Sequence, residues 1–331
     1  MMQTGIETGG SMKLEANNSA AIFKGATVLL IGGNGFIGSH LQDELKLHGY
    51  RVRVLDRSLE KFRIKQDDIE YIEGEFTDNE ALSRAIDGCD LIVHLAQAIT
   101  PLGTSSKAEY AAIEQSGAFA RMLDFINYAG VKNIIYFSSG GAVYGNPSSN
   151  QVTESSELNP VSPYGVSKLM MEKYLQMYAH LHDMKYLIIR PSNPYGPRQN
   201  FRSGQGVIPI FMRKVIRNET VTIWGDGTAT KDYIYIDDLV VATRRLLETG
   251  LDNNVYNIAS GVNYSLTQLL NEISSCTDLT PNVDYKPVYK SDVQKIYFSC
   301  EKLIKRTGWK PRTTLKQGLK KTRTWLQETI D

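Results

Sequence analysis

A tyrosine and a lysine four residues apart form an arrangement in this chain that could transfer a proton. Tyr164 and Lys168 lie in the segment YGVSK, at the expected start of a helix, so both side chains project from one face. A lysine ammonium near a phenol, together with a positively charged nicotinamide, stabilises the tyrosinate and brings its pKa from about 10 toward neutrality. The spacing alone also fits an ordinary solvated helix face, so the catalytic interpretation depends on a dinucleotide site elsewhere in the chain.

A glycine-rich segment supplies that site. Residues Gly32 to Gly38, GGNGFIG, satisfy both the G-x-G-x-x-G and the G-x-x-G-x-x-G spacing. Such a turn brings backbone N–H groups close to a pyrophosphate and lets a helix begin there, with its positive end toward the anion. Asp56 ends the second expected strand, at the offset of about 20 residues where a carboxylate binds the adenosine ribose. This context favours dinucleotide binding over a flexible glycine loop with a surface aspartate.

Asp56 also bears on which dinucleotide is bound. A carboxylate at the ribose edge would repel a 2′-phosphate, so it favours NAD over NADP. Arg57 follows in sequence and could instead stack on adenine or bind a phosphate. We predict NAD as the cofactor. We predict no metal site, because the three cysteines lie far apart in the sequence: Cys89, Cys276 and Cys300.

The order of the elements predicts how these residues come together. From Ala26 onward, short apolar runs alternate with longer amphipathic segments. Continuous apolar strands separated by helical segments are typical of a parallel sheet covered on both faces. We therefore expect an α/β fold with a Rossmann-type doubly wound parallel sheet and a smaller C-terminal α/β substrate domain. The apolar runs are TVLLI, RVRVLD, IEYIEG, DLIVHLA, VKNIIYFSS and MKYLIIR.

Composition divides the 331 residues into three regions. Residues 1–24 are rich in small and polar residues, and we expect a flexible leader there. The NAD-binding Rossmann domain is expected at 25–192, because the turn-rich stretch PSNPYGPRQNFRSGQG follows Arg190. Residues 193–331 are then expected to be mainly the substrate-binding domain, with elements that return to the Rossmann domain.

Charge and hydropathy exclude several classes of partner. The chain has 37 Lys plus Arg against 36 Asp plus Glu, so no net basic field attracts nucleic acid or an anionic membrane. No run approaches the about 20 apolar residues of a membrane-spanning helix. Cysteines without close pairing fit a reducing compartment. The sequence thus predicts a soluble cytoplasmic protein that binds a small molecule.

Seven motifs in order resemble the extended short-chain dehydrogenase/reductase family, and within it the nucleotide-sugar epimerases typified by UDP-galactose 4-epimerase. The resemblance covers nearly everything from Gly25 to Leu326. The motifs are GGNGFIGSH at 32–40, HLA at 94–96, SSGGAVYG at 138–145, YGVSK at 164–168, RPSNPYGPRQ at 190–199, WGDGTATKDYIYIDD at 224–238 and GWKP at 308–311.

The resemblance implies a reaction at C4 of a sugar. Tyr164 would take the proton from the 4-hydroxyl while the nicotinamide takes hydride from C4. Lys168 would bond the nicotinamide ribose and tune the tyrosine. The 4-ketosugar would then turn over within the pocket and receive the hydride on its other face, so the cofactor ends the cycle oxidised.

The same resemblance assigns the remaining site residues, with Ser139 as a third catalytic group. Asn193 would hold the nucleotide sugar, although it equally fits a turn before Pro194. The residues expected to bind NAD are Gly32, Gly35, Phe36, Ile37, Gly38, Asp56, Arg57, Glu75, Phe76, Leu95, Ala96, Gln97, Ser138, Tyr164, Lys168 and Pro191. The residues expected to bind the substrate are Ser139, Gly140, Tyr164, Asn193, Arg198, Val207, Trp224, Lys231 and Tyr289.

Three of these positions depart from the family pattern. Gly140 stands where the family has a Ser or Thr whose hydroxyl bonds the reacting sugar oxygen, and Ser139 or a water would have to serve instead. Lys231 and Tyr289 stand where arginines hold the substrate diphosphate, so we expect a less rigid grip there. Lys290 could compensate.

Three functions therefore stay open. The leading one is an NAD-dependent 4-epimerase of a UDP-hexose or UDP-N-acetylhexosamine, serving surface polysaccharide synthesis. A nucleotide-4-ketosugar reductase would need the same tyrosine and lysine but a dissociable cofactor. A non-catalytic dinucleotide-binding sensor is the third, and Gly140 is its best support.

By resemblance, helices at 107–129 and 163–181 would pair across a two-fold axis into a homodimer.

Overall fold

A seven-stranded sheet forms the larger part of the fold. The computed structural model describes residues 23–58, 64–97, 106–148, 151–202, 206–288 and 293–329. The strand order is β10-β6-β5-β4-β1-β2-β3 and every neighbouring pair is parallel, which confirms the predicted doubly wound α/β fold. The strands are β1 (Thr27–Ile31), β2 (Arg51–Asp56), β3 (Glu70–Glu73), β4 (Leu91–His94), β5 (Asn133–Phe137), β6 (Lys185–Pro191) and β10 (Asn254–Ile258).

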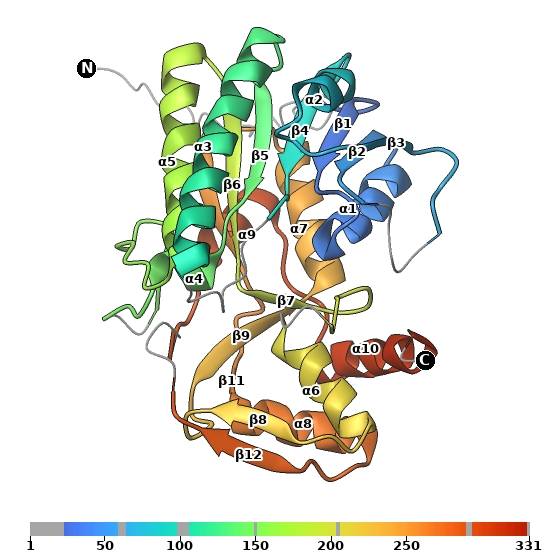
Figure 1. The fold of residues 1–331 in the computed structure, drawn as a ribbon, viewed down its shortest axis with the longest axis vertical. Helices are drawn as coiled ribbons and strands as arrows, with labels where there is room; N and C mark the ends of the chain where they lie inside the picture. Colours follow the sequence, from blue (N-terminus) through green and yellow to red (C-terminus); the bar gives the residue numbers. More distant parts are fainter. Residues whose placement is uncertain are drawn as a thin grey trace, which may run out of the picture.

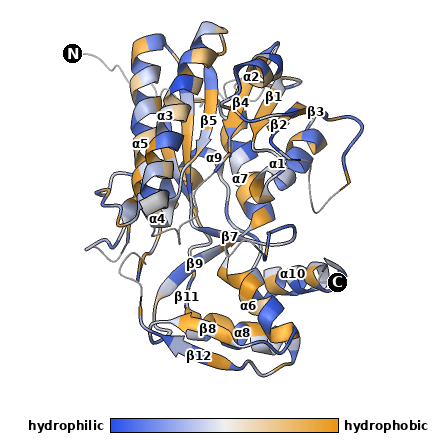
Figure 2. Ribbon diagram, viewed as in Figure 1, coloured by the Kyte–Doolittle hydropathy of each residue, from blue (hydrophilic) through white to orange (hydrophobic). Residues whose placement is uncertain are grey.

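Helices cover both faces of this sheet because successive strand residues are apolar on both sides. In β1, Leu29 packs in a cluster with helices α2, α3 and α5, whereas Leu30 packs with α1, α7 and α9. Figure 1 shows α3 and α5 side by side on one face, and Figure 2 shows the strands of this sheet as largely hydrophobic. The helices are α1 (Phe36–Leu47), α2 (Asn79–Ile86), α3 (Ser106–Tyr128), α5 (Pro163–His182), α7 (Ile236–Glu248) and α9 (Glu301–Thr307).

A smaller second part of the chain lies below the seven-stranded sheet in Figure 1. It contains a three-stranded sheet in the order β11-β9-β7 and a parallel pair of β12 and β8. The elements of the smaller part are β7 (Asn193–Tyr195), α6 (Val207–Ile216), β8 (Val221–Trp224), β9 (Thr230–Tyr235), β11 (Asn263–Ser265), α8 (Leu266–Thr277), β12 (Val283–Lys286) and α10 (Leu315–Thr329). The short helix α4 (Gly140–Tyr144) instead lies beside α5 of the larger part.

The chain crosses between the two parts more than once. It leaves the large sheet after β6, builds β7, α6, β8 and β9 below, and returns with α7 and β10, which pairs with β6. Segments from both parts therefore meet at the carboxyl ends of the parallel strands. Among the helices in the described ranges, none has the length and apolarity required to cross a bilayer.

Candidate active site

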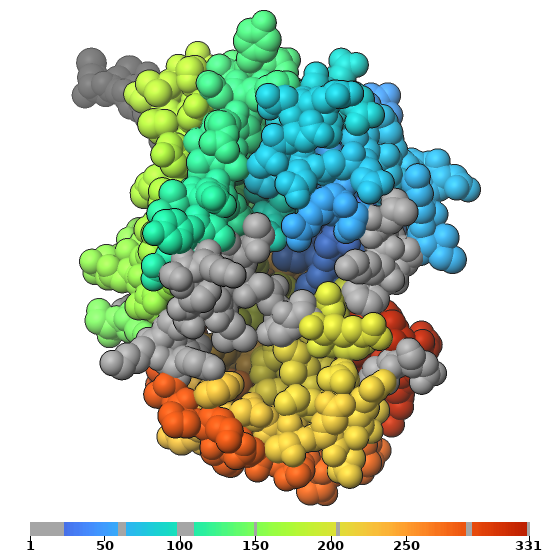
Figure 3. Space-filling view, in the orientation of Figure 1, coloured from blue at the N-terminus to red at the C-terminus, as the bar shows by residue number. Residues whose placement is uncertain are grey.

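A cavity of about 1510 Å³ lies where the two parts meet. Its wall begins with the residues that follow β1, β2, β4 and β5, so it opens at the carboxyl edge of the sheet, the usual ligand site of open α/β sheets. In Figure 3 a small opening is visible between the blue and green atoms of the large part and the yellow atoms of the smaller part. The cavity is thus shared by both parts of the chain.

The glycine turn fits a dinucleotide pyrophosphate. Gly32 has φ 79° and a Cβ there would lie 2.7 Å from the backbone nitrogen of Ala96, so only glycine fits this close approach. Gly35 is the N-cap of α1 and offers no side chain to the first-turn amides, which favours an external anion. Gln42 of α1 donates to the Gly33 carbonyl over 2.8 Å and holds the turn against the helix.

Asp56 is fixed at the edge of the same cavity. The backbone N–H of Asn34 donates to its carboxylate over 2.9 Å, and that of Ser58 over 3.4 Å. Burial raises the pKa of Asp56, while the hydrogen bonds from these amides oppose the rise. The side chain of Asn34 in turn donates to the Ser58 carbonyl over 2.7 Å. Sequence reasoning missed Asn34 and Ser58, although Asn34 lies inside the glycine motif.

All the residues predicted to bind the dinucleotide line this cavity. They are Gly32, Gly35, Phe36, Ile37, Gly38, Asp56, Arg57, Glu75, Phe76, Leu95, Ala96, Gln97, Ser138, Tyr164, Lys168 and Pro191.

Tyr164 and Lys168 are presented by the first turns of α5. Ser162 is the N-cap, and its hydroxyl accepts a hydrogen bond from the N–H of Gly165 over 3.1 Å, which fixes where the helix begins. The Lys168 side chain is buried, and its ammonium donates to the Phe137 carbonyl over 2.8 Å. The ammonium lies 5.9 Å from the centre of the Tyr164 ring. Both side chains line the cavity beside Ser138.

Burial shifts the pKa values of both members of the pair. Burial raises the pKa of Tyr164 to about 12, and a hydrogen bond from Ser139 acts in the opposite direction. Burial lowers the pKa of Lys168 to about 7, while the negative charge of Glu172 opposes that shift. The sequence expectation of a lowered tyrosine pKa includes the positive charge of a bound nicotinamide, so it stays a prediction. Ser139 is the one protein group here that favours the tyrosinate.

Gly140 has a steric explanation. A Cβ at this position would lie 2.5 Å from the Phe298 ring and 3.1 Å from the Pro191 carbonyl oxygen. Gly140 is buried and is not among the residues that line the cavity, and its contact with substrate stays a prediction. Ser139 does line the cavity and bonds Tyr164. The aromatic side chain of Phe298 therefore excludes the family's hydroxyl residue from position 140, and the hydroxyl next to it faces the tyrosine.

A buried ionic network lies behind the pair, and sequence reasoning did not identify it. Arg190 donates to both carboxylate oxygens of Glu172, over 3.0 and 2.6 Å, and to the Tyr144 hydroxyl over 2.9 Å. Ser138 also donates to Glu172. Glu172 lies one helical turn after Lys168 on the same face of α5, a spacing that could have revealed it. The network fixes α5 against β6 behind the reacting groups.

Most of the residues predicted to bind substrate line the cavity, and one of them lies outside the described residues. Asn193 lines the cavity, and its side-chain amide donates to the Asp232 carbonyl over 2.8 Å. The Lys231 ammonium donates to the Val293 carbonyl. Tyr289 lies outside the described residues, as does Lys290. The predicted substrate residues that line the cavity are Ser139, Tyr164, Asn193, Arg198, Val207, Trp224 and Lys231.

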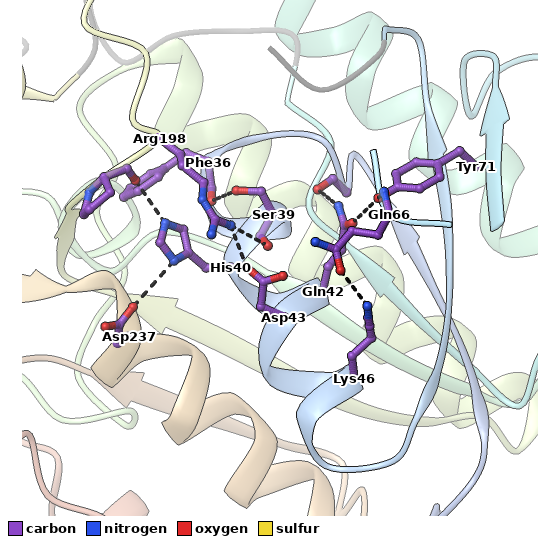
Figure 4. Close-up of polar contacts among 12 residues, drawn as sticks. Phe36, Ser39, His40, Gln42, Asp43, Lys46, Gln66, Tyr71, Arg198 and Asp237 are labelled. Carbon is purple, nitrogen blue, oxygen red and sulfur yellow. Dashed lines mark hydrogen bonds and ion pairs between the residues drawn. The ribbon is translucent and has the colours of Figure 1, made fainter. Parts of the chain in front are cut away.

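Arg198 has an additional partner that the sequence did not predict. Its guanidinium donates to the Ser39 carbonyl over 3.0 Å and to the Asp43 carboxylate over 2.7 Å, as Figure 4 shows. Both partners belong to α1. Arg198 lines the cavity while these two hydrogen bonds direct its guanidinium at the helix, and its role as a substrate contact stays a prediction.

Comparisons with known proteins agree with this geometry. The family model described as "NAD dependent epimerase/dehydratase family" matches residues 28–259. A putative UDP-glucose 4-epimerase of Methanocaldococcus jannaschii is 33% identical over 304 residues, covering 91% of this chain and 98% of the relative. A dTDP-4-dehydro-6-deoxyglucose reductase of Escherichia coli is 29% identical, with 89% and 95% covered. The crystal structure of UDP-glucose 4-epimerase with UDP-glucose from Thermotoga maritima has TM-score 0.86 and 34% identity, with 92% and 100% covered.

Proposed function

Because the chain belongs to the NAD-dependent epimerase/dehydratase family, we propose that it is a nucleotide-sugar 4-epimerase acting on a UDP-linked hexose or N-acetylhexosamine. The observation that carries this proposal is that Tyr164 and Ser139 line the same cavity as the residues expected to bind NAD and as residues of the smaller part. A sugar in that cavity would have its hydroxyl within reach of the tyrosine and its carbon within reach of the cofactor.

Each protein group has a distinct task in the proposed reaction. Tyr164 accepts the proton of the sugar 4-hydroxyl, and Ser139 stabilises the tyrosinate through its hydrogen bond. Lys168, whose ammonium lies 5.9 Å from the centre of the Tyr164 ring, would bind the nicotinamide ribose. NAD would supply the hydride acceptor and, in its oxidised form, a further positive charge. On return, Tyr164 gives the proton back to the sugar oxygen.

The diphosphate and base would be held by the smaller part. Lys231 and Trp224 line the end of the cavity remote from the glycine turn, on neighbouring segments of β8 and β9. The Lys231 ammonium has three N–H donors, so it can bind a phosphate oxygen while it donates to the Val293 carbonyl. A lysine makes a point contact rather than a two-pronged one, so it allows the diphosphate some movement.

A reductase is the second candidate, because the reductase relative from Escherichia coli matches nearly the whole chain. The two functions differ in cofactor use. An epimerase keeps its NAD through turnover, whereas a 4-ketosugar reductase consumes reduced cofactor stoichiometrically.

Proton NMR of the sugar anomeric signals separates the candidates. Purified protein without added cofactor is incubated with UDP-glucose, UDP-N-acetylglucosamine and their uronates. Appearance of the 4-epimer supports the proposal and identifies the substrate. Conversion of a 4-ketosugar only when NADH or NADPH is supplied assigns the reductase instead. If neither assay shows conversion, the non-catalytic dinucleotide-binding sensor becomes the favoured function.

We also propose a homodimer formed through α3 and α5. These neighbouring helices carry large apolar side chains that are exposed in the single chain: Tyr110, Ile113, Val166, Met177 and Leu181. Burying them against a second copy would remove this apolar surface from water. Light scattering after size-exclusion chromatography should give twice the chain mass for the parent, and Ile113→Glu with Met177→Glu should give one chain. A monomeric parent would contradict the dimer.

A further inference from the structure

The chain that follows β7 crosses over helix α1. The Pro197 carbonyl oxygen lies 3.0 Å from the His40 Nε2 atom, and the Arg198 guanidinium reaches Ser39 and Asp43. Figure 4 shows these contacts on one side of the helix, with Gln42 on another side. Segment 196–199 of the smaller part is therefore attached to the first three turns of the helix that begins at the glycine motif.

The same segment is held from its other side by α7. A Cβ at Gly196, where φ is 153°, would lie 2.5 Å from the Ile236 side chain, so the backbone packs tightly there. The Asp237 carboxylate lies 3.5 Å from the Nδ1 atom of His40. Segment 196–199 is thus enclosed between α1 and α7.

Arg198 has a backbone conformation that it does not favour. Its φ is 64°, in the left-handed region that residues with a Cβ rarely adopt. Such a conformation persists when the surrounding contacts hold it. The bonds from its guanidinium to Ser39 and Asp43 are contacts of that kind.

We propose that Arg198 and Asp43 are positioning residues for NAD, and that their ion pair holds segment 196–199 against α1 and slows release of the dinucleotide. Arg198 and Gln199 share the cavity wall with Phe36 and Ile37 at the start of α1. A segment that separates from α1 therefore opens the cavity beside the glycine turn. Gln42, on the same helix, fixes the Gly33 carbonyl, so a shift of α1 also reaches the turn itself.

The proposal does not depend on the reaction that the enzyme performs. It requires only that the chain binds NAD, and release of the dinucleotide can be measured without any sugar. Failure of the 4-epimerase assignment would leave this measurement unaffected.

Asp43→Asn is the most informative variant, because Asp43 is not among the residues lining the cavity and the change keeps the side-chain shape. NADH bound to the protein is displaced by excess NAD, and the fall of its fluorescence gives the release rate. We expect release to be about five- to ten-fold faster than in the parent, the effect of weakening one charge-assisted hydrogen bond.

Glu219→Gln is the matched control. The pair of Arg213 and Glu219 has an N···O distance of 3.0 Å and side chains 26% and 39% exposed, against 2.7 Å with 23% and 38% for Arg198 and Asp43. It lies in the smaller part, away from α1. The control should release NADH at the parent rate. Equal acceleration in both variants would overturn the proposal, and so would a parent-like rate in Asp43→Asn.

A charge exchange separates positioning from general destabilisation. In the double variant Asp43→Arg with Arg198→Asp the ion pair can form again, and aspartate tolerates the left-handed backbone at position 198 better than most residues. Slow release should return at least in part. If release stays fast although the thermal midpoint matches that of the parent, the ion pair does not retain the cofactor. If the double variant does not fold, Arg198→Asn provides a second test. This variant should release NADH as fast as Asp43→Asn does.

Discussion

The two walls of the cavity are built in different ways. The NAD wall consists of backbone at strand ends, where Gly32 and Gly35 shape a turn and nearby amides fix Asp56. The sugar wall consists of side chains from distant segments, among them Lys231, whose ammonium donates to the Val293 carbonyl. The first wall is shaped by backbone that the sheet fixes, whereas the second is shaped by side chains with several rotatable bonds. We infer that NAD is held rigidly while the sugar nucleotide is held in a way that permits movement.

That difference suits a reaction in which the sugar turns over and the cofactor stays. A 4-ketosugar presented on both faces to one nicotinamide must rotate, which a rigid grip on its diphosphate would resist. A rigid NAD wall, reinforced by segment 196–199, keeps the hydride acceptor in place meanwhile. Variants on each wall should therefore alter different measured quantities.

The largest effect is expected where both walls meet, at Tyr164. Tyr164→Phe removes the only atom that can accept the sugar proton at this position, and kcat should fall about 1000-fold, within the usual range for loss of a general base. The dissociation constant of NAD should change little, because the phenylalanine keeps the ring and the other residues expected to bind NAD are unchanged. Unchanged turnover in this variant would overturn the assignment of the base.

Asp56→Ala tests the NAD wall alone. Loss of hydrogen bonds from ribose hydroxyls to a carboxylate should weaken NAD binding about 10- to 100-fold. Isothermal titration measures the affinity, and the Michaelis constant of the sugar nucleotide at saturating NAD should stay the same. A parent protein that binds NADP as tightly as NAD would contradict our interpretation of this carboxylate.

Ser139→Ala tests the hydrogen bond to the reacting tyrosine. That bond lowers the pKa of Tyr164, so its removal raises the pKa further. The tyrosinate is then lost at higher pH, and the limb of the kcat profile that falls toward acid should move to more basic pH. We expect kcat near neutral pH to fall about ten-fold, as for loss of one charge-assisted hydrogen bond. A profile with an unmoved acid limb would remove Ser139 from the mechanism.

Gly140→Ser should have the smallest effect on chemistry and a clear effect on stability. The new side chain meets the Phe298 ring, and such overpacking costs about 1–3 kcal/mol of unfolding free energy. Gly141→Ser is the control, since a Cβ there meets nothing within 4 Å. Denaturant unfolding should show the loss only at position 140, and the loss caused by Gly140→Ser should be smaller when it is measured in a Phe298→Ala background. Equal losses at both positions would contradict the steric explanation.

The NAD wall could be predicted from the sequence because its determinants are local. The glycine turn, the strand before it and the helix after it are contiguous, and the apolar runs predicted the sheet that carries them. The sequence also predicted helices at 107–129 and 163–181, which the structure has as Ser106–Tyr128 and Pro163–His182. A ligand site built from backbone requires glycines at fixed spacing between a strand and a helix, and this pattern can be seen within one segment of the sequence.

The contacts of Gly140 and Arg198 could not be predicted in the same way. The space at Gly140 is set by Phe298, and the bonds of Arg198 depend on Ser39 and Asp43, all far away in the sequence. Neither partner leaves a local pattern. The pKa of Tyr164 is a similar case, since burial by the whole fold is the largest cause of its shift.

The most direct test of the central claim follows the hydrogen at C4 of the sugar. UDP-glucose with deuterium at C4, or the substrate identified by NMR, is incubated with the protein as purified. If hydride leaves C4 and returns to the other face while NAD stays bound, the 4-epimer should carry deuterium at C4. Loss of the deuterium to solvent or to a dissociable cofactor would contradict a retained-NAD 4-epimerase.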